Sequence, residues 1–148
     1  MINLSIKFII ATTILSILGF SSWLIYEPWL RLLDFFETES KHPETFFEEQ
    51  TCILGQTRMK GSVNVGILEQ KLYLSHTSPL NYFIHPLLID LEAISKIEPC
   101  FEVLLNESYK FFIGNPHITT LVLAQDLVEK LEQEYGEPIF SNKLSELS

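Results

Sequence analysis

Histidine and cysteine, the side chains that most often bind metals or act as nucleophiles, are few and scattered in this sequence. No histidine lies four residues from another potential ligand, and no HExxH, GxSxG or phosphate-binding glycine motif occurs. We therefore predict a protein that is not an enzyme and holds no metal ion or cofactor, although a triad built from distant residues would leave no local motif. The histidines are His42, His76, His85 and His117.

The two cysteines, Cys52 and Cys100, are far apart in the chain and outside any CxxC motif, so a zinc site is not expected. We expect each to be a small buried hydrophobic residue. A disulfide is the alternative if the domain faces an oxidising compartment.

An uncharged, mainly apolar run from Phe8 to Ile25 dominates the N-terminal part of the chain. Its length is close to the lower limit of the ~17–25 residues that a helix needs to cross a membrane. Trp23, Tyr26 and Trp29 gather where charged residues return, as aromatic side chains do at a membrane–water boundary. The run therefore predicts a single-pass membrane helix with these three residues at the membrane interface.

Two other interpretations of this run stay open. Lys7, the apolar stretch after it and the small residues of Gly19-Phe20-Ser21 match the three regions of a cleaved signal peptide. Alternatively, the serines and threonines of the run lower its hydrophobicity enough for a helix that packs against protein. Orientation also stays open, because the Lys and Arg content of the two flanks differs little.

The chain has 148 residues and a formal net charge of −9, with 47% hydrophobic and 20% charged residues. Outside the apolar run, enough chain remains for one modest domain with a core. Phosphate backbones bind clustered Lys and Arg, which a chain this acidic does not offer. We therefore expect no nucleic-acid partner.

Changes in composition divide the chain into four parts. Residues 1–28 form the predicted membrane anchor, and residues 29–50 a juxtamembrane helix and an acidic linker, with a helix break at Glu27-Pro28-Trp29. Residues 51–136 form the predicted β-rich domain, and residues 137–148 a flexible tail.

Short β-rich runs separated by turn residues fill the domain. In the clearest run, Val63, Val65 and Ile67 alternate with small or polar residues, which is the period of a half-buried strand. Seven such runs predict a mainly β (α+β), antiparallel barrel or sandwich. The predicted strands are 51–58, 62–68, 71–75, 87–91, 101–106, 110–113 and 118–123, and the predicted turns include Lys60-Gly61, Glu69-Gln70, Asn106-Glu107-Ser108 and Gly114-Asn115-Pro116.

One C-terminal helix is predicted after the strands. Asp126 and Glu129 resemble a capping box, Leu127 and Leu131 repeat at helical spacing, and Gly136 marks the end.

Two short sequence segments of the domain resemble segments of a group of small uncharacterised bacterial proteins with a pleckstrin-homology-like (PH-like, PH/GRAM-like) barrel. They are Val65-Gly66-Ile67 leading into Leu72-Tyr73-Leu74-Ser75, and His85-Pro86-Leu87-Leu88-Ile89 before Glu92. The resemblance covers about Thr51 to Tyr135, and it departs from the family at two places. Leu87 is found where the family has a second proline, and Asp90-Leu91 where the family has Pro-Trp. It implies mainly a fold, a barrel capped by the C-terminal helix. Together with the predicted membrane helix, we expect a single-pass protein of the bacterial inner membrane, with the side of the domain open.

PH domains that bind phosphoinositides use basic residues of the first hairpin, and the resemblance puts Arg58 and Lys60 there, with Lys71 nearby. Each such cation contributes only roughly 1 kcal/mol at an anionic surface. We therefore predict foremost a membrane-anchored, non-catalytic interaction or scaffolding module with a protein or peptide partner. The alternatives are an anionic lipid headgroup or small ligand bound by Arg58 and Lys60, and an exported domain with a cleaved leader.

Overall fold

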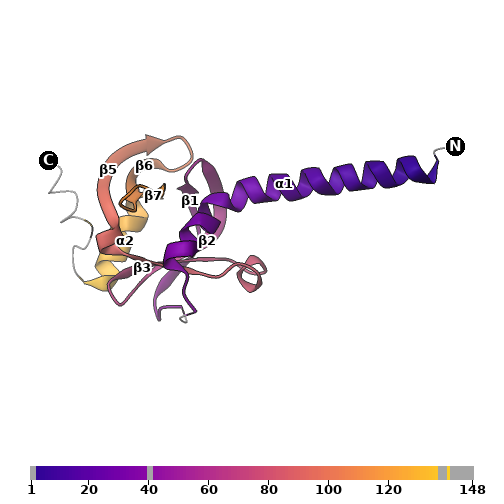
Figure 1. Ribbon diagram of the computed structural model, residues 1–148. Helices are drawn as coiled ribbons and strands as arrows, with labels where there is room; N and C mark the ends of the chain where they lie inside the picture. Colours follow the sequence, from indigo (N-terminus) through magenta and orange to yellow (C-terminus); the bar gives the residue numbers. More distant parts are fainter. Residues whose placement is uncertain (1–2, 40–41, 137–139, 141–148) are drawn as a thin grey trace.

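The computed structural model describes residues 3–39, 42–136 and 140, and shows a curled β-sheet from which one long helix projects (Figure 1). That helix, α1, spans Leu4–Phe36, and a second helix, α2, spans Gln125–Tyr135. The strands are β1 Phe46–Leu54, β2 Thr57–Leu68, β3 Lys71–His76, β4 Leu87–Asp90, β5 Ile94–Glu102, β6 Asn106–Ile113 and β7 Thr119–Ala124, with 3-10 helices at Leu80–Tyr82 and Leu91–Ala93.

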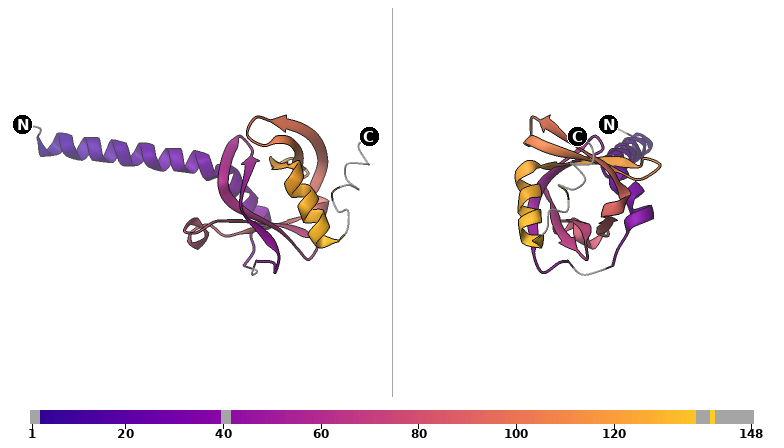
Figure 2. Two further views of the ribbon diagram at one scale, coloured as in Figure 1. Left: turned by 180° about the vertical axis from the view of Figure 1, so that it is seen from behind. Right: turned by 90° about the vertical axis from the view of Figure 1, so that its left-hand side faces the viewer.

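All seven strands belong to a single antiparallel sheet with the order β4-β3-β2-β1-β7-β6-β5. Each pair joins strands that are consecutive in the chain, except that β1 pairs with β7. The sheet curls into a half-barrel, and α2 and the C-terminal part of α1 lie along different sides of it (right panel of Figure 2). The prediction of seven antiparallel strands followed by one helix is confirmed.

The first hairpin differs from its prediction. β1 begins at Phe46, inside the segment predicted as an acidic linker, and the predicted strand 51–58 includes the turn at Gly55 between β1 and β2. Gly61 is not a turn residue, because it lies within β2 at a register shift between the two strands, with a φ of +59°. Glycine adopts this left-handed conformation without steric cost, so here it marks a bulge.

The fifth strand is also misplaced in the prediction. The predicted strand 101–106 is the end of β5, the turn and the first residue of β6, whereas β5 itself runs from Ile94. Its sequence includes Lys96 and Pro99, which a central strand disfavours. β5 is an edge strand, where such residues are tolerated.

The helix α1 continues through Pro28, so the predicted break at this position is wrong. Proline has no N–H to donate to the Leu24 carbonyl, and α1 bends where it meets the sheet instead of ending there (Figure 1). The residues after the proline explain the continuation, because Trp29 and Leu32 have exposed fractions of 0% and pack in the core. Packing of these side chains against the sheet therefore keeps the helix continuous past Pro28.

The helix α2 begins after Ala124, whose side chain makes no capping bond, so the predicted capping box is wrong. Glu129 instead accepts a hydrogen bond from Gln125 Nε2 at 3.1 Å. The predicted end is confirmed: Gly136 is the C-cap, with a φ of +84°, and donates its N–H to the Glu132 carbonyl at 2.8 Å.

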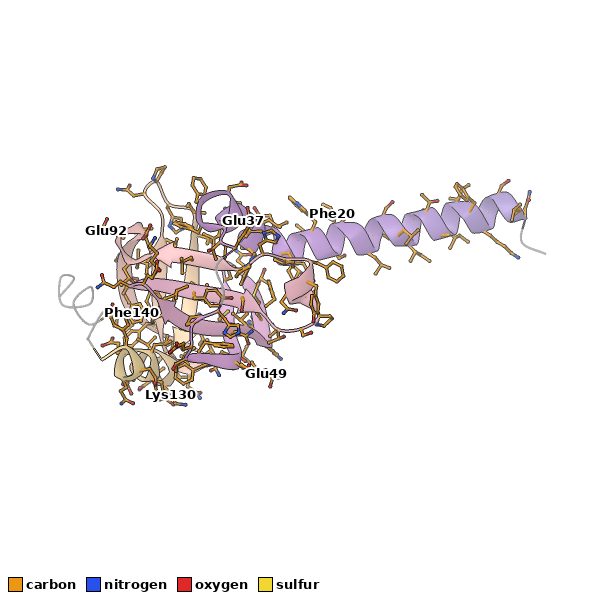
Figure 3. All side chains as sticks on the ribbon, turned by 90° about the horizontal axis from the view of Figure 1, so that it is seen from below. Phe20, Glu37, Glu49, Glu92, Lys130 and Phe140 are labelled. Atoms are coloured by element: carbon orange, nitrogen blue, oxygen red, sulfur yellow. The ribbon has the colours of Figure 1, made fainter. Side chains whose placement is uncertain are left out.

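A single core joins both helices to the inward face of the sheet. Phe140 belongs to it too, with its ring edge-on to Phe111 at 5.3 Å between ring centres (Figure 3). The rest of the segment predicted as a flexible tail, 137–148, lies outside the described residues. The core residues of the two helices are Trp29, Leu32, Leu127, Val128 and Leu131.

Candidate functional site

The N-terminal part of α1 stands clear of the sheet (Figures 1 and 3). None of the 18 residues of Leu4–Ser21 is buried, and this is the one helix in the described part of the chain that is long and apolar enough to cross a membrane. Thr12, Thr13 and Ser16 donate their hydroxyls to carbonyls four residues earlier at 2.8–2.9 Å, so these groups are satisfied within the helix. A signal sequence shares this length and composition.

Aromatic contacts hold α1 where it enters the domain. Trp29 Nε1 donates a hydrogen bond to the His85 carbonyl at 3.1 Å, and the Trp29 ring lies against His76 with 4.0 Å between ring centres. Tyr26 meets His76 edge-on at 5.7 Å. These contacts tie α1 to both ends of the loop between β3 and β4.

Turns at the same end of the half-barrel also meet α1. Arg31 pairs with Glu27 and donates from a guanidinium nitrogen to the Ile118 carbonyl at 3.1 Å. A Cβ atom added to Gly55 in the β1–β2 turn would lie only 3.3 Å from Pro28 Cγ. α1 and these turns therefore approach too closely for a flexible connection between the helix and the sheet.

Only part of the predicted membrane-interface cluster is accessible. Trp23 is 53% exposed and stacks on Phe20 with 6.2 Å between ring centres, and Tyr26 is half-buried. Trp29 is fully buried inside the domain, so the interface role predicted for this residue is wrong. An aromatic residue at the end of an apolar helix suits a core as well as a lipid boundary, and the sequence alone does not distinguish the two.

Both ring nitrogens of His76 are buried without a hydrogen-bond partner. Burial lowers the pKa of His76 from 6.5 to about 4, because the charged form loses its hydration. At pH 7 the ring is therefore neutral and packs as an aromatic surface beneath Tyr26 and Trp29. The contacts of its ring are with two aromatic side chains of α1.

The two residues predicted to contact a ligand, Arg58 and Lys60, are both exposed on β2. They share the outer face of the sheet, because alternate residues of a strand point the same way and Met59 between them is buried. Lys71 is not with them. It begins β3, and its Nζ lies 3.5 Å from Asp90 Oδ1.

A further basic residue, Lys110, joins this outer face through the strand register. Arg58 lies opposite Ile53 of β1, which lies opposite Val122 of β7. Val122 in turn lies opposite Lys110 of β6. Ile53 and Val122 are buried even though they are outside the core, as expected when long basic side chains lie over apolar neighbours. Only the pairing of β1 with β7 brings Lys110 into line with Arg58, so no local sequence signal indicates it. On its other side Lys110 lies opposite Glu98 of β5, where the basic row ends.

The two edges of the sheet differ in their protection. Beside β4, Glu37 forms a bridge with Leu87, Glu37 Oε1 lies 2.5 Å from His85 Nδ1, and Thr38 donates its N–H to Pro86. β5 pairs with β6 alone, and no strand in the described ranges covers its other edge. The β5 edge is therefore the open one.

A groove of about 490 Å³ lies between the β5–β6 hairpin and the first turn of α2. Phe101, 67% exposed, and Leu105 line one wall, and Gln125 and Glu129 line the other. Asn106, Glu107 and Asp126 also line the groove, so Phe101 and Leu105 lie among polar and acidic neighbours. Extended peptides commonly bind where an open strand edge is combined with pockets for side chains.

Within the described residues, no group of three His, Cys, Asp or Glu side chains could hold a metal ion. Cys52 and Cys100 are both free, so the disulfide alternative is wrong. Burial raises the pKa of the Cys52 thiol to about 12, as expected for a cysteine that serves as a small hydrophobic residue. Cys100 is only partly buried.

Comparisons with known proteins give no match: no protein-family model, curated protein or solved structure is significantly similar to this chain. The fold and the site therefore define only a structural class, a half-barrel of seven antiparallel strands that carries an apolar N-terminal helix.

Proposed function

We propose that this protein is a non-catalytic interaction module with a PH-like fold, held at a membrane by a single N-terminal helix. The observation that carries the proposal is the exposure of Leu4–Ser21, none of which is buried. An apolar helix of this length is not stable when surrounded by water, and its own domain does not cover it. A bilayer is the environment that suits its length, its composition and its internally bonded hydroxyls.

The PH-like part of the proposal is supported by the sheet. Seven antiparallel strands in one curled sheet, followed by a helix that packs into the core, match the architecture that the resemblance implies. The supporting residues for an interaction role are those of the open β5 edge and the groove beside Phe101. An extended peptide added to β5 would gain main-chain hydrogen bonds from the edge and apolar contact from the groove.

Fractionation of the full-length, C-terminally tagged protein tests the anchor. We expect the protein to stay in the membrane pellet after an alkaline wash and to keep its full mass. A shortened mass would indicate a cleaved leader, and soluble protein of full mass would indicate a helix that packs on a protein partner.

A photoreactive amino acid at Phe101 tests the docking surface in the same membranes. We expect a discrete cross-linked product from this position, and none from Lys130, which is exposed on the outer side of α2. Equal yields from both positions would contradict docking at the β5 edge.

Recognition of an anionic headgroup is the second candidate function, and the row of Arg58, Lys60 and Lys110 favours it. We expect salt-sensitive binding of a soluble inositol phosphate to the full chain in zwitterionic nanodiscs, lost in the variant Arg58→Ala/Lys60→Ala. The variant Lys71→Ala/Lys130→Ala removes the same charge elsewhere and is the control. If no binding occurs at low salt, this candidate is wrong.

A further inference from the structure

The loop between β3 and β4, residues 77–86, presents two large aromatic side chains to solvent. Tyr82 is 76% exposed and Phe83 is 81% exposed, at the end of the 3-10 helix Leu80–Tyr82. Soluble surfaces seldom display adjacent aromatic residues to this degree, and such pairs commonly mark a binding surface.

Both ends of this loop are fixed against α1. At its N-terminal end, the loop follows His76, which contacts Tyr26 and Trp29. Near its C-terminal end, the carbonyl of His85 accepts the hydrogen bond from Trp29 Nε1. From this base, the loop protrudes beyond the rest of the domain on the side toward which the exposed part of α1 runs (Figure 1 and left panel of Figure 2). Its tip therefore extends toward any membrane that α1 enters.

The charge of the segment agrees with this placement. No Asp, Glu, Lys or Arg occurs between Lys71 and Asp90, although the chain has a net charge of −9. The β5–β6 hairpin is a useful contrast: Val103 at its tip is 87% exposed, but Glu102 and Glu107 flank it. Carboxylates oppose entry into an anionic headgroup layer, and the loop itself contains none. Glu48 and Glu49 of β1 border the pocket beside the loop, so they lie close to its base.

We infer that Tyr82 and Phe83 insert into the interfacial layer of the same bilayer that α1 spans, so that the domain contacts the membrane at a second point. Aromatic side chains favour this layer because their apolar rings and polar groups suit its two sides. The contacts with Tyr26 and Trp29 hold the loop in place beforehand, which reduces the entropy lost on insertion. This inference rests on the proposed membrane anchor.

Site-directed spin labelling of the full chain in vesicles of zwitterionic and anionic phospholipids tests the inference. The background carries Cys100→Ser, and Cys52 is buried away from reagents. Labels are placed at Phe83→Cys, at Leu15→Cys in the exposed part of α1, and at Val103→Cys as the matched exposed control. We expect the first two labels to collide more often with oxygen than with a water-soluble nickel chelate, and the Val103 label to show the reverse.

The outcomes separate the loop from the anchor. A Phe83 label in water with a Leu15 label in lipid would overturn the inference and leave the anchor intact, whereas both labels in water would overturn the anchor. A Phe83 label shielded from both reagents would indicate a protein partner and would also overturn the inference. As a second measurement, the variant Tyr82→Ser/Phe83→Ser should return a label at Asn81→Cys to water without changing the Leu15 label.

Discussion

The part of α1 before Pro28 (the earlier part) and the part after it (the later part) belong to one helix but have different surroundings. Leu15, before the proline, is 69% exposed, whereas Leu32, after it, is fully buried against the sheet. Both are leucines in a continuous helix, so neither residue type nor secondary structure accounts for the difference. What differs is the position of partners: the later part has a half-barrel to cover, and the earlier part has no protein around it in the described residues.

Polar groups show the same contrast. Before Pro28, the hydroxyls of Thr12 and Thr13 bond to the helix's own backbone. After it, the polar groups of Trp29 and Arg31 bond to carbonyls of distant loops. The hydroxyls of the earlier part therefore find their hydrogen-bond partners within the helix, as polar groups of a helix in hydrocarbon must. The later part forms its polar contacts with the domain.

The largest expected effect comes from removing the domain contact of the later part. Trp29→Ala deletes a fully buried indole and its hydrogen bond, and should lower the free energy of unfolding by about 3–5 kcal/mol. Denaturant unfolding in mild detergent measures this. The neighbouring variant Leu30→Ala, at a position that is 39% exposed, should have a smaller effect. Equal decreases in the free energy of unfolding for both variants would contradict the prediction that the Trp29 side of this helical segment is packed more tightly than the Leu30 side.

A charge in the earlier part should act on membrane retention alone. An arginine at the centre of a membrane helix costs about 2.5–3.5 kcal/mol, so Leu15→Arg should increase the fraction released by an alkaline wash. The unfolding midpoint of the domain should not change, because Leu15 makes no contact with the core. A lowered midpoint would contradict the separation of the two parts.

The smallest expected effect concerns His76, whose ring packs against Tyr26 and Trp29 of α1. Because the pKa of His76 is about 4 in the fold and about 6.5 in the unfolded chain, the unfolded state binds a proton first as the pH falls. Stability should therefore decrease between pH 6.5 and pH 4, by an amount on the order of 2 kcal/mol. His76→Phe keeps an aromatic ring there and should remove this acid sensitivity. Unfolding curves across that pH range test it, and an unchanged pH profile would be the contrary result.

Local patterns in the sequence were sufficient for the architecture. Alternation at Val63 and Val65, the turn at Glu69-Gln70 and the helix end at Gly136 all correspond to the structure. Errors arose where distant parts of the chain decide the outcome. Pro28 is a helix breaker locally, and the helix continues because Trp29 and Leu32 after it are buried against the sheet.

The candidate site was less predictable for the same reason. Arg58 and Lys60 could be named from a resemblance, but Lys110 joins them only through pairing between β1 and β7. Tyr82 and Phe83 carried no periodic signal, because a loop has none, and their exposure depends on where β3 and β4 hold its ends.

If α1 is the membrane anchor proposed above, the proline in α1 also limits how deep the helix can lie in the bilayer. Without an N–H from Pro28, the carbonyl of Leu24 loses the donor that an uninterrupted helix would supply. In hydrocarbon a carbonyl without a donor costs several kcal/mol, whereas at the headgroups water can satisfy it. Under the proposed membrane anchor, this one main-chain oxygen would oppose deeper insertion of the apolar segment and so set the distance between the half-barrel and the lipid.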